Sequence, residues 1–431
     1  MSRVCVIGGG STYTPELVDG LLRRRAELDL SEVVLVDNDA ARLEVLGPLA
    51  RRMAERTTGT GTGGVDVHWT TDPVEGIRGS SWVVSQIRVG GMAARDRDER
   101  LGREFGLIGQ ETVGVGGMAN ALRTIPVALD LAAIVAAEAP GATLFNFTNP
   151  SGLVTEALCR HTDVPTIGLC NVPWSTKAEV ASVFGVTPEA VDLDYVGLNH
   201  LSWMRAVTIG GEDRTAEVLA GLRALVGKQV THDGEPGWSP EAIEVLGAIP
   251  NYYLLYYYET EAWLAHQASR PTRAAEVMEI EEALLEQYRD PNLDHKPAEL
   301  EQRGGAYYSE AAAALMADLA SDAGTVHVVN VPNAGAIPGF PDDVVVEVAA
   351  TINRSGAVPR PTEALRPDVD ALMRTIKDVE LLCVQAAVEG DEDAALQALL
   401  AHPLGPGAHQ VRAVWNRMKE LNAGWFGRLD D

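Results

Sequence analysis

Short apolar runs alternate with helical patterns in the first part of the chain. Residues 3–7 form an apolar run of the buried-strand type, and three glycines at 8–10 follow at once. A helical pattern covers residues 14–22, and residues 33–36 form a second buried strand that ends at Asp37. This order of strand, glycine turn, helix, strand and acidic residue spans about one βαβ unit.

The same alternation continues for about 100 more residues. Further strands are expected at 65–70, 82–87, 143–147 and 166–169, with helices at 39–55 and 125–138. Short strands that alternate with helices favour a doubly wound parallel sheet. We therefore predict an α/β fold, with a Rossmann-like domain over residues 1–169.

The pattern changes after about residue 170. Helical spacing recurs at 213–228, 273–290, 307–321 and 364–390, and strands are expected at 326–331 and 344–348. Because the regular alternation is lost, we predict a C-terminal α+β domain over residues 170–431. No clean linker separates the two parts, so we expect them to share an interface.

Charge and composition exclude several classes of protein. The chain has 61 acidic and 35 basic side chains, a formal net charge of −26. Phosphate-binding nucleic-acid proteins are usually basic, and anionic membranes repel so negative a surface, so neither partner is expected. Four cysteines are too few for a disulfide framework. No apolar run approaches the roughly 18 residues of a membrane span, and no secretory signal precedes the first strand, so we expect a cytoplasmic protein.

The glycine turn is the first candidate site. Gly8 and Gly10 form a GxG, but Tyr13 stands in place of the third glycine of GxGxxG. Glycines let the backbone approach a pyrophosphate at a helix N-terminus. Asp37 can accept hydrogen bonds from the adenosine ribose hydroxyls, which favours NAD over NADP. The alternative is a tight turn in an unrelated α/β protein.

Cys170 and His200 form a second candidate site. Cys170 follows the predicted strand at 166–169, and His200 ends the motif 197–200. A thiolate and an imidazole can bind a divalent transition metal, whose shell a substrate's oxygens or water would complete. Their spacing of 30 residues is no short metal signature, so these residues alone leave open a buried cysteine and a hydrogen-bonded histidine.

Two further motifs carry polar side chains that suit a substrate site. Asn149 precedes Pro150 at the carboxyl end of a predicted strand, where open α/β sheets bind ligands. Tyr253 belongs to a cluster of five tyrosines at 252–258, and a tyrosine is a base only if its pKa falls well below about 10. The alternatives are an ordinary Asn-Pro turn and aromatic packing on a helix.

Arginines and a glycine-rich segment complete the candidates. Arg95 and Arg273 suit phosphate, because a guanidinium can bind it through two parallel hydrogen bonds. Residues 109–117 are expected to form a glycine-rich loop that carries Glu111. The alternatives are a solvated helix face and a plain surface connection.

Together these motifs resemble family 4 of the glycoside hydrolases, whose members are NAD- and metal-dependent glycosidases. Most of the chain takes part in the resemblance, and so many matches in the same order are specific. The matching segments are 6–15, 90–95, 109–112, 146–152, 168–171, 197–200, 250–253, 272–273 and 330–338.

The resemblance implies a role for each candidate. In such enzymes NAD⁺ takes hydride from C3 of a sugar, a base takes the C2 proton, the aglycone is eliminated, water adds and hydride returns. The implied residues are Gly8, Gly10, Ser11, Thr12, Asp37 and Arg42 for the cofactor, Cys170 and His200 for a divalent metal such as Mn²⁺, Arg95, Asn149, Asn171 and Arg273 for the substrate, Tyr253 as base, and Glu111 to raise its basicity.

One position bears on the anomer. Members that act on α-linked phosphoglucosides tend to carry an acid directly after the metal cysteine, and here that residue is Asn171. The resemblance therefore implies hydrolysis of phosphorylated β-glucosides, such as cellobiose 6-phosphate, by a homodimer or homotetramer. The alternatives are an α-acting member or an α-galactosidase of the same family, and a non-catalytic NAD sensor.

A malate- or lactate-type 2-hydroxy-acid dehydrogenase is a further alternative, since that class resembles the N-terminal half. It would produce NADH and need no metal.

Overall fold

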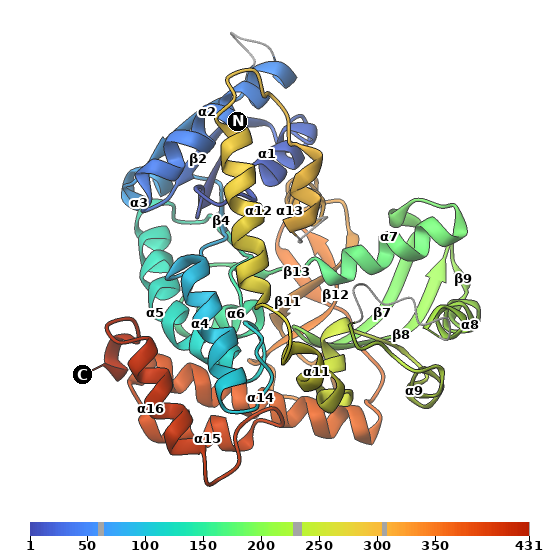
Figure 1. Cartoon of the computed structure of the whole chain (residues 1–431). Helices are drawn as coiled ribbons and strands as arrows, with labels where there is room; N and C mark the ends of the chain where they lie inside the picture. Colours follow the sequence, from blue (N-terminus) through green and yellow to red (C-terminus); the bar gives the residue numbers. More distant parts are fainter. Residues whose placement is uncertain (59–63, 227–234, 304–307, 431) are drawn as a thin grey trace.

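The computed structural model describes residues 1–58, 64–226, 235–303 and 308–430. In these residues thirteen strands form one sheet, in the order β10-β8-β7-β12-β11-β6-β5-β4-β1-β2-β3, with β9 beside β8 and β13 beside β12 (Figure 1). The parallel strands are β1 (Ser2–Ile7), β2 (Leu30–Val36), β3 (Asp66–Thr70), β4 (Trp82–Ser85), β5 (Thr143–Asn146) and β6 (Thr166–Gly168). Their order is that of a doubly wound sheet, which confirms the predicted fold class.

The C-terminal strands extend the same sheet in antiparallel fashion. Asn330 pairs with Gly168, which joins β11 to the edge of the parallel part. These strands are β7 (Val191–Leu198), β8 (Leu201–Ile209), β9 (Glu212–Asp213), β10 (Ile249–Pro250), β11 (Thr325–Pro332), β12 (Val345–Asn353) and β13 (Gly356–Pro359). The hairpin β7–β8 was not predicted, because its buried part carries polar residues, Tyr195 and Ser202, whose further partners, Glu347 and Asn251, are distant in sequence.

Helices cover both faces of the sheet. Those of the N-terminal half are α1 (Thr14–Arg23), α2 (Ala40–Thr58), α3 (Pro73–Ile77), α4 (Gly91–Glu104), α5 (Gly114–Glu138) and α6 (Ser151–His161). Those of the C-terminal half are α7 (Val172–Phe184), α8 (Thr215–Val226), α9 (Pro240–Leu246), α10 (Leu255–Tyr258), α11 (Thr260–Gln267), α12 (Arg273–Tyr288), α13 (Tyr308–Ser321), α14 (Pro367–Glu389), α15 (Glu392–Ala401) and α16 (Val411–Leu421). The four helices predicted in this half match α8, α12, α13 and α14, except at residues 227, 228 and 307, which lie outside the described residues.

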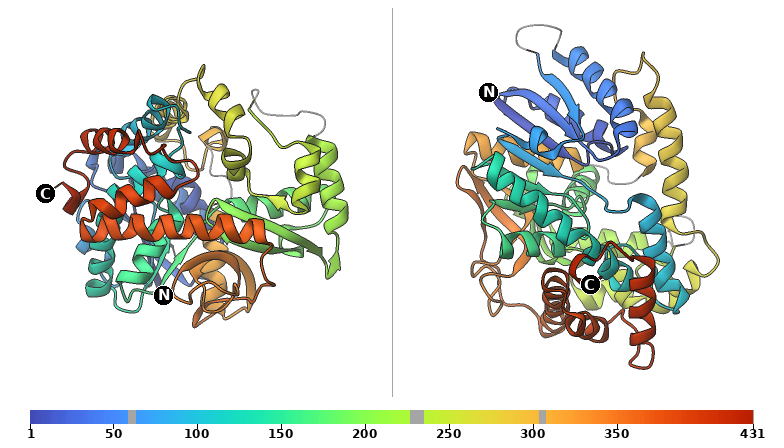
Figure 2. Two further views of the ribbon diagram at one scale, coloured as in Figure 1. Left: turned by 90° about the horizontal axis from the view of Figure 1, so that it is seen from below. Right: turned by 90° about the vertical axis from the view of Figure 1, so that its left-hand side faces the viewer.

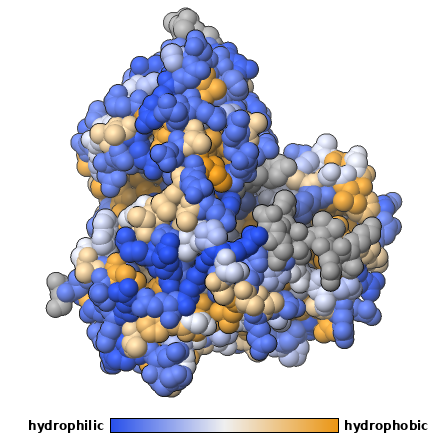
Figure 3. Space-filling view, viewed as in Figure 1, coloured by the Kyte–Doolittle hydropathy of each residue, from blue (hydrophilic) through white to orange (hydrophobic). Residues whose placement is uncertain are grey.

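The two halves are packed against each other. Helix α14 lies beside α5 and α6, and α15 packs against α14 (Figures 1 and 2). Helices α8 and α9, with the ends of β7 and β8, form a side lobe that projects from the molecule (Figure 1). Hydrophilic residues cover most of the face shown in Figure 3, as the acidic composition leads one to expect.

Helix α5 corrects the prediction of a loop over 109–117 followed by a helix at 125–138. The helix already begins at Gly114. A Cβ on Gly116 would lie 2.2 Å from the Gln110 carbonyl oxygen, and one on Gly117 would lie 2.5 Å from the Thr112 carbonyl carbon. The glycines are therefore needed because the first turn of the helix packs directly on neighbouring backbone.

Helix α5 is also long and apolar enough to cross a membrane, which corrects the expectation that no apolar run approaches that length. Its most apolar 18-residue window has a mean hydropathy of 1.4, and 61% of that window is buried inside the molecule. The helix packs against α4, α6 and α14. A helix buried in the core of a protein can be as long and as apolar as a membrane span, so these two properties alone do not place α5 in a membrane.

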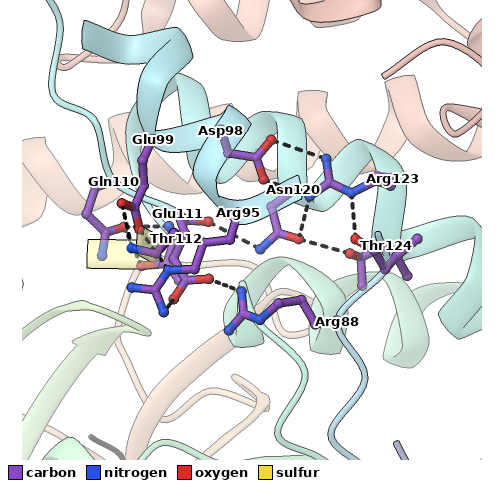
Figure 4. A network of polar contacts seen from close by, with 12 residues as sticks. Arg88, Arg95, Asp98, Glu99, Gln110, Glu111, Thr112, Asn120, Arg123 and Thr124 are labelled. Atoms are coloured by element: carbon purple, nitrogen blue, oxygen red, sulfur yellow. Dashed lines mark hydrogen bonds and ion pairs between the residues drawn. The ribbon is translucent and has the colours of Figure 1, made fainter. Parts of the chain in front are cut away.

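A buried ion pair holds α5 to α4. The Arg123 guanidinium donates to Asp98 at 2.7 Å, to the Val89 carbonyl at 2.9 Å and to Asn422 Oδ1 at 2.5 Å (Figure 4). Burial raises the pKa of Asp98 to about 6, against the lowering effect of Arg123.

We expect Arg123→Met to lower the free energy of unfolding by about 3–5 kcal/mol, because it leaves Asp98 buried without a cation. The loss should be larger at about pH 8 than at about pH 5. Without Arg123, the pKa of Asp98 in the folded protein rises further above its value in the unfolded chain. The variant therefore loses more folding stability than the parent as the pH rises and Asp98 ionises. Urea unfolding at both pH values measures it. Arg100→Met, which removes an exposed ion pair with Asp96 on the same helix, should cost at most about 1 kcal/mol; equal losses for the two variants would contradict the account.

Candidate active site

A cavity of about 710 Å³ opens at the carboxyl ends of β1, β2 and β4. Gly8, Asp37 and Gln86 line it, and each follows one of these strands. Strand β1 lies between β2 and β4, where the strand order reverses and open α/β sheets bind their ligands.

The glycine turn brings backbone to this cavity at close quarters. Gly8 has φ +88°, and a Cβ there would lie 2.8 Å from the Gln86 carbonyl oxygen. The Gly10 N–H donates to Asp37 Oδ2 at 2.8 Å, where a side chain on Gly10 would collide. The turn leads into α1, so the cavity has the glycines, the helix N-terminus and the acid that a dinucleotide site requires.

Five of the six predicted cofactor residues line the cavity: Gly8, Gly10, Ser11, Asp37 and Arg42. Thr12 is buried behind them, where its hydroxyl donates to Glu281 at 3.0 Å and its carbonyl accepts from the Tyr288 hydroxyl at 2.8 Å. Helix α12, from the C-terminal half, therefore fixes the glycine turn.

Sequence reasoning missed several charged residues of this cavity, among them Glu281 and Arg303. Glu281 accepts from Arg42 at 3.0 Å and from Arg303 at 2.9 Å, and the Arg303 guanidinium lies 5.5 Å from the centre of the Tyr13 ring. No motif marks either residue, because a lone charged residue in a helical pattern is usually interpreted as part of a solvated face. Only the folded structure shows which residues it contacts.

Three predicted residues meet beyond the cavity, each at the end of a strand. His200 occupies the turn between β7 and β8 with φ +63°, and its ring stacks on that of Tyr253 with centroids 3.7 Å apart and planes 5° from parallel. Asn251 follows β10 and accepts the Tyr253 N–H at 3.1 Å. Cys170 follows β6, and its thiol is close enough to contribute to the raised pKa of Tyr253.

Glu111 lies between two arginines beside this group (Figure 4). It forms ion pairs with Arg88 and, at 3.0 Å, with Arg95, which also pairs with Glu99 at 2.7 Å. Burial alone would raise the pKa of Glu111, but the two arginines hold it below its usual range. Arg88 was not predicted. It lines the cavity and contacts Glu111, so it joins the dinucleotide cleft to the Tyr253 group.

The predicted substrate residues divide into two groups. Asn149 lines the cavity, and its buried Oδ1 has no hydrogen-bond partner among the described residues. Asn171 directly follows Cys170, with its Oδ1 4.0 Å from the sulfur. Arg273 is not brought to the group: it is exposed at the start of α12, where it pairs with Glu276 at 3.0 Å and with the Gln302 carbonyl at 3.2 Å.

The donor set fits a divalent metal that takes further ligands from outside the chain. The described residues contain no group of three or more His, Cys, Asp or Glu side chains suited to a metal. Burial lowers the pKa of His200 to about 3, so its imidazole is neutral, and Nδ1 lies 3.0 Å from Thr112 Oγ1, which leaves Nε2 for a ligand. Burial raises the pKa of Cys170, and a hydrogen bond from Asn199 opposes this.

A dinucleotide cleft that is joined through Arg88 and Glu111 to a group of a tyrosine, a thiol and an imidazole defines an enzyme of dehydrogenase-like fold. The chain belongs to the family 4 glycosyl hydrolases. The family model matches residues 3–186, and the model of the family 4 C-terminal domain matches residues 195–405.

Two similar proteins span the whole chain. A probable 6-phospho-beta-glucosidase of Bacillus subtilis is 38% identical over 435 residues, 98% of this chain and 97% of that protein. The 6-phospho-beta-glucosidase of Escherichia coli is 38% identical over 442 residues, 100% of this chain and 97% of that protein. By contrast, the 6-phospho-alpha-glucosidase of Leptotrichia buccalis is 27% identical over 451 residues.

Solved structures agree with this assignment. The 6-phospho-beta glucosidase of Thermotoga maritima with NAD and glucose-6-phosphate matches with a TM-score of 0.91 at 34% identity, over 97% of this chain and 98% of that one. The same enzyme with manganese, NAD⁺ and glucose-6-phosphate matches with a TM-score of 0.90. Malate dehydrogenase of Plasmodium falciparum matches with a TM-score of 0.54 at 13% identity, a likeness of fold alone.

Proposed function

We propose that this chain is a 6-phospho-β-glucosidase that works with NAD⁺ and a divalent metal, preferably Mn²⁺. The observation that carries the proposal is the placement of Tyr253, stacked on His200 and beside Cys170 and Glu111, next to a dinucleotide cleft whose Arg88 pairs with Glu111. The 38% identity to 6-phospho-beta-glucosidases over the whole chain supports it.

The chain's own residues would hold both cofactors. The glycine turn, Ser11, Asp37 and Arg42 would bind NAD⁺, with Thr12 behind the turn, and Cys170 with His200 would bind the metal. When bound, NAD⁺ supplies a hydride acceptor for C3 of the sugar, and the divalent ion supplies a Lewis acid for the C3 oxygen. Oxidation at C3 acidifies the proton on C2.

Tyr253 is the base of the proposed reaction, and its phenolic oxygen takes the C2 proton. Burial raises its pKa, as do Cys170 and Glu111, whereas Arg95 and Arg88 lower it. Glu111 therefore strengthens the phenolate as a base, and the divalent ion, when bound, would supply the positive charge that lowers the raised pKa of Tyr253. Loss of the C2 proton drives elimination of the aglycone from C1, water adds back at C1, and the returned hydride makes the net reaction a hydrolysis.

The residue after Cys170 supports β specificity. Asn171 cannot donate a proton as an acid, and it directly precedes α7 with its side chain turned to the sulfur. Asn149, with an unpaired oxygen at the cavity, and Arg95 would bind the hydroxylated and anionic parts of the sugar.

Arg273 would bind the 6-phosphate. Its guanidinium is exposed, and the next residue, Ala274, donates its N–H to Glu99, the partner of Arg95. We expect Arg273→Ala to lower kcat/KM on a 6-phosphorylated substrate about 10- to 100-fold, since hydrogen bonds to charged groups contribute about 1.5–3 kcal/mol. Steady-state kinetics on the unphosphorylated analogue should show a much smaller change.

The matched control for this change is Arg289→Ala, which removes a similar exposed i,i+3 pair with Glu286 near the other end of α12. It should leave both substrates unaffected. Equal losses on phosphorylated and unphosphorylated substrates in Arg273→Ala would count against the phosphate role.

The proposed function is tested by hydrolysis of 4-nitrophenyl β-glucoside 6-phosphate with NAD⁺ and Mn²⁺, each omitted in turn. We expect release of 4-nitrophenol only when both are present, with no net NADH. Activity that survives the loss of either cofactor, or a faster rate on the α-anomer, would refute the assignment.

We further propose that residues 1–169 form the dinucleotide domain and residues 170–431 the metal, substrate and oligomerisation domain of a cytoplasmic homodimer or homotetramer. Exposed apolar side chains on the side lobe, Leu225 and Val245, and on α7, Val183, support a subunit contact there. The four unpaired cysteines are in keeping with a reducing compartment. Sedimentation velocity measures the oligomeric state.

A further inference from the structure

A buried carboxylate without a cationic partner lies behind the proposed metal site. Glu347, on β12, is 1% exposed, and in the described part of the chain it forms no ion pair with a Lys, Arg or His side chain. Three neutral groups donate to it: the Tyr195 hydroxyl at 2.7 Å, and the amides of Asn199 and Asn330 at 3.0 Å each. Because all three are donors, Glu347 acts as an acceptor toward each of them.

One branch of hydrogen bonds leads from Glu347 to the metal ligand Cys170. The amide of Asn199 donates to Glu347 and also hydrogen-bonds the sulfur of Cys170, which favours the thiolate. An amide nitrogen carries two hydrogens, so it can serve both acceptors at once. Because Glu347 accepts from the amide nitrogen of Asn199, it orients this side chain so that the nitrogen also faces the sulfur of Cys170. Asn199 also immediately precedes His200, so the same amide anchors the turn that carries the second ligand.

A second branch leads from Glu347 to the proposed base. The Tyr195 hydroxyl lies 2.6 Å from Ser202 Oγ, and the Asn251 amide donates to that hydroxyl oxygen of Ser202 at 2.9 Å. Asn251 Oδ1 accepts the Tyr253 N–H at 3.1 Å. A continuous path of buried hydrogen bonds therefore runs from Glu347 to the backbone of Tyr253.

The charges give a reason for this arrangement. Glu347 is close enough to Cys170 to interact with it electrostatically, so a carboxylate and a thiolate at these two positions repel each other. Burial of an unpaired carboxylate is also costly. A divalent cation at Cys170 and His200 would relieve both conflicts, since it supplies the positive charge that no described side chain provides to Glu347.

We propose that Glu347 is a positioning residue that orients Cys170 through Asn199 and the Tyr253 segment through Tyr195, and that balances the charge of the bound divalent ion. The proposal rests on the proposed function, because it takes Cys170 and His200 as the metal ligands. Loss of a group that orients a metal ligand typically costs 10- to 100-fold in metal affinity.

Mn²⁺ binding to the whole chain tests this proposal, measured from the electron paramagnetic resonance signal of free Mn²⁺ in the presence of NAD⁺ and glucose 6-phosphate. Glu347→Gln should raise the Kd for Mn²⁺ about 10- to 100-fold. Asn199→Ala should do the same, and the double variant should lose no more than either single variant, because both act on one path. Tyr195→Phe should leave the Kd unchanged and lower kcat without raising KM.

The matched control is Glu156→Gln, which alters another fully buried carboxylate, one paired with Lys377 at 2.8 Å and Arg160 at 3.1 Å. It should lower thermal stability and leave the Kd for Mn²⁺ within twofold. The proposal would be overturned if folded Glu347→Gln bound Mn²⁺ with the parental Kd, or if the losses were additive in the double variant. If Glu347→Gln does not fold, the Kd of Asn199→Ala for Mn²⁺ decides, and a parental value overturns the proposal. If the parent chain binds no Mn²⁺, the proposed metal site itself is wrong and the proposal falls with it.

Discussion

Tyr253→Phe is expected to lower kcat about 10²- to 10⁴-fold, the range that a general base contributes. The change removes only the phenolic oxygen, so the ring can still stack on His200 as it does at 3.7 Å. We therefore expect Mn²⁺ and NAD⁺ affinities and KM to stay close to those of the parent. Steady-state kinetics on 4-nitrophenyl β-glucoside 6-phosphate, with Mn²⁺ binding measured in parallel, checks both parts.

A neighbouring tyrosine provides the control. Tyr252 is half-exposed, and its hydroxyl donates to Glu235 at 2.9 Å, so Tyr252→Phe should retain parental turnover. If Tyr253→Phe keeps more than about a tenth of the parental kcat, this tyrosine is not the base. A chain that only senses NAD⁺ would show no dependence on Tyr253 at all.

Cys170→Ser is expected to abolish Mn²⁺-dependent activity, with a loss of at least about 100-fold in Mn²⁺ affinity, more than the usual cost of an outer-shell change. Among the described residues the proposed metal site has two side-chain ligands, Cys170 and His200, and a neutral hydroxyl is a far weaker ligand than a thiolate. Activity measured over a range of Mn²⁺ concentrations checks this result.

The control here is Cys159→Ser. Cys159 is half-buried on α6, and its sulfur contacts the Thr166 carbonyl at 4.0 Å, so the change should leave Mn²⁺ dependence intact. Full activity of Cys170→Ser in manganese buffer would remove Cys170 from the metal site.

The parallel half of the fold could be predicted because each strand there is a short apolar run followed by a turn signal. The run at 3–7 with its glycines, and the run at 33–36 with Asp37, became β1 and β2 around the cavity. The hairpin β7–β8 could not be found in the same way. Its buried residues Tyr195 and Ser202 are polar and are satisfied by Glu347 and Asn251, which are distant in sequence.

The candidate site likewise contains some residues that could be predicted from the sequence and others that could not. Cys170, His200, Tyr253 and Glu111 could be named because the family resemblance carries them, and the structure brings them together. Arg88 could not be named, because its role depends on an ion pair with Glu111 across the fold. The role of such a residue depends on the residues that it contacts in the folded structure. The sequence around a single charged residue does not indicate which residues these are.

The fold also shows how a chain of net charge −26 can receive two anionic ligands. Positive charge is concentrated at the cavity and beside Tyr253, in Arg42, Arg88, Arg95 and Arg303, and each of these side chains is held by a buried glutamate. The acidic residues elsewhere keep the surface hydrophilic, while a few paired arginines and a helix N-terminus provide the local attraction.

The central claim is that hydrolysis proceeds through cleavage of the C–H bonds at C3 and C2, with Tyr253 as the base at C2. Its most direct test is the turnover rate of 4-nitrophenyl β-glucoside 6-phosphate that carries deuterium at C2 or at C3, compared with the unlabelled substrate. The account predicts slower turnover of the labelled substrates, because both bonds break in the reaction. Identical rates for labelled and unlabelled substrates, as direct displacement at C1 requires, would contradict it.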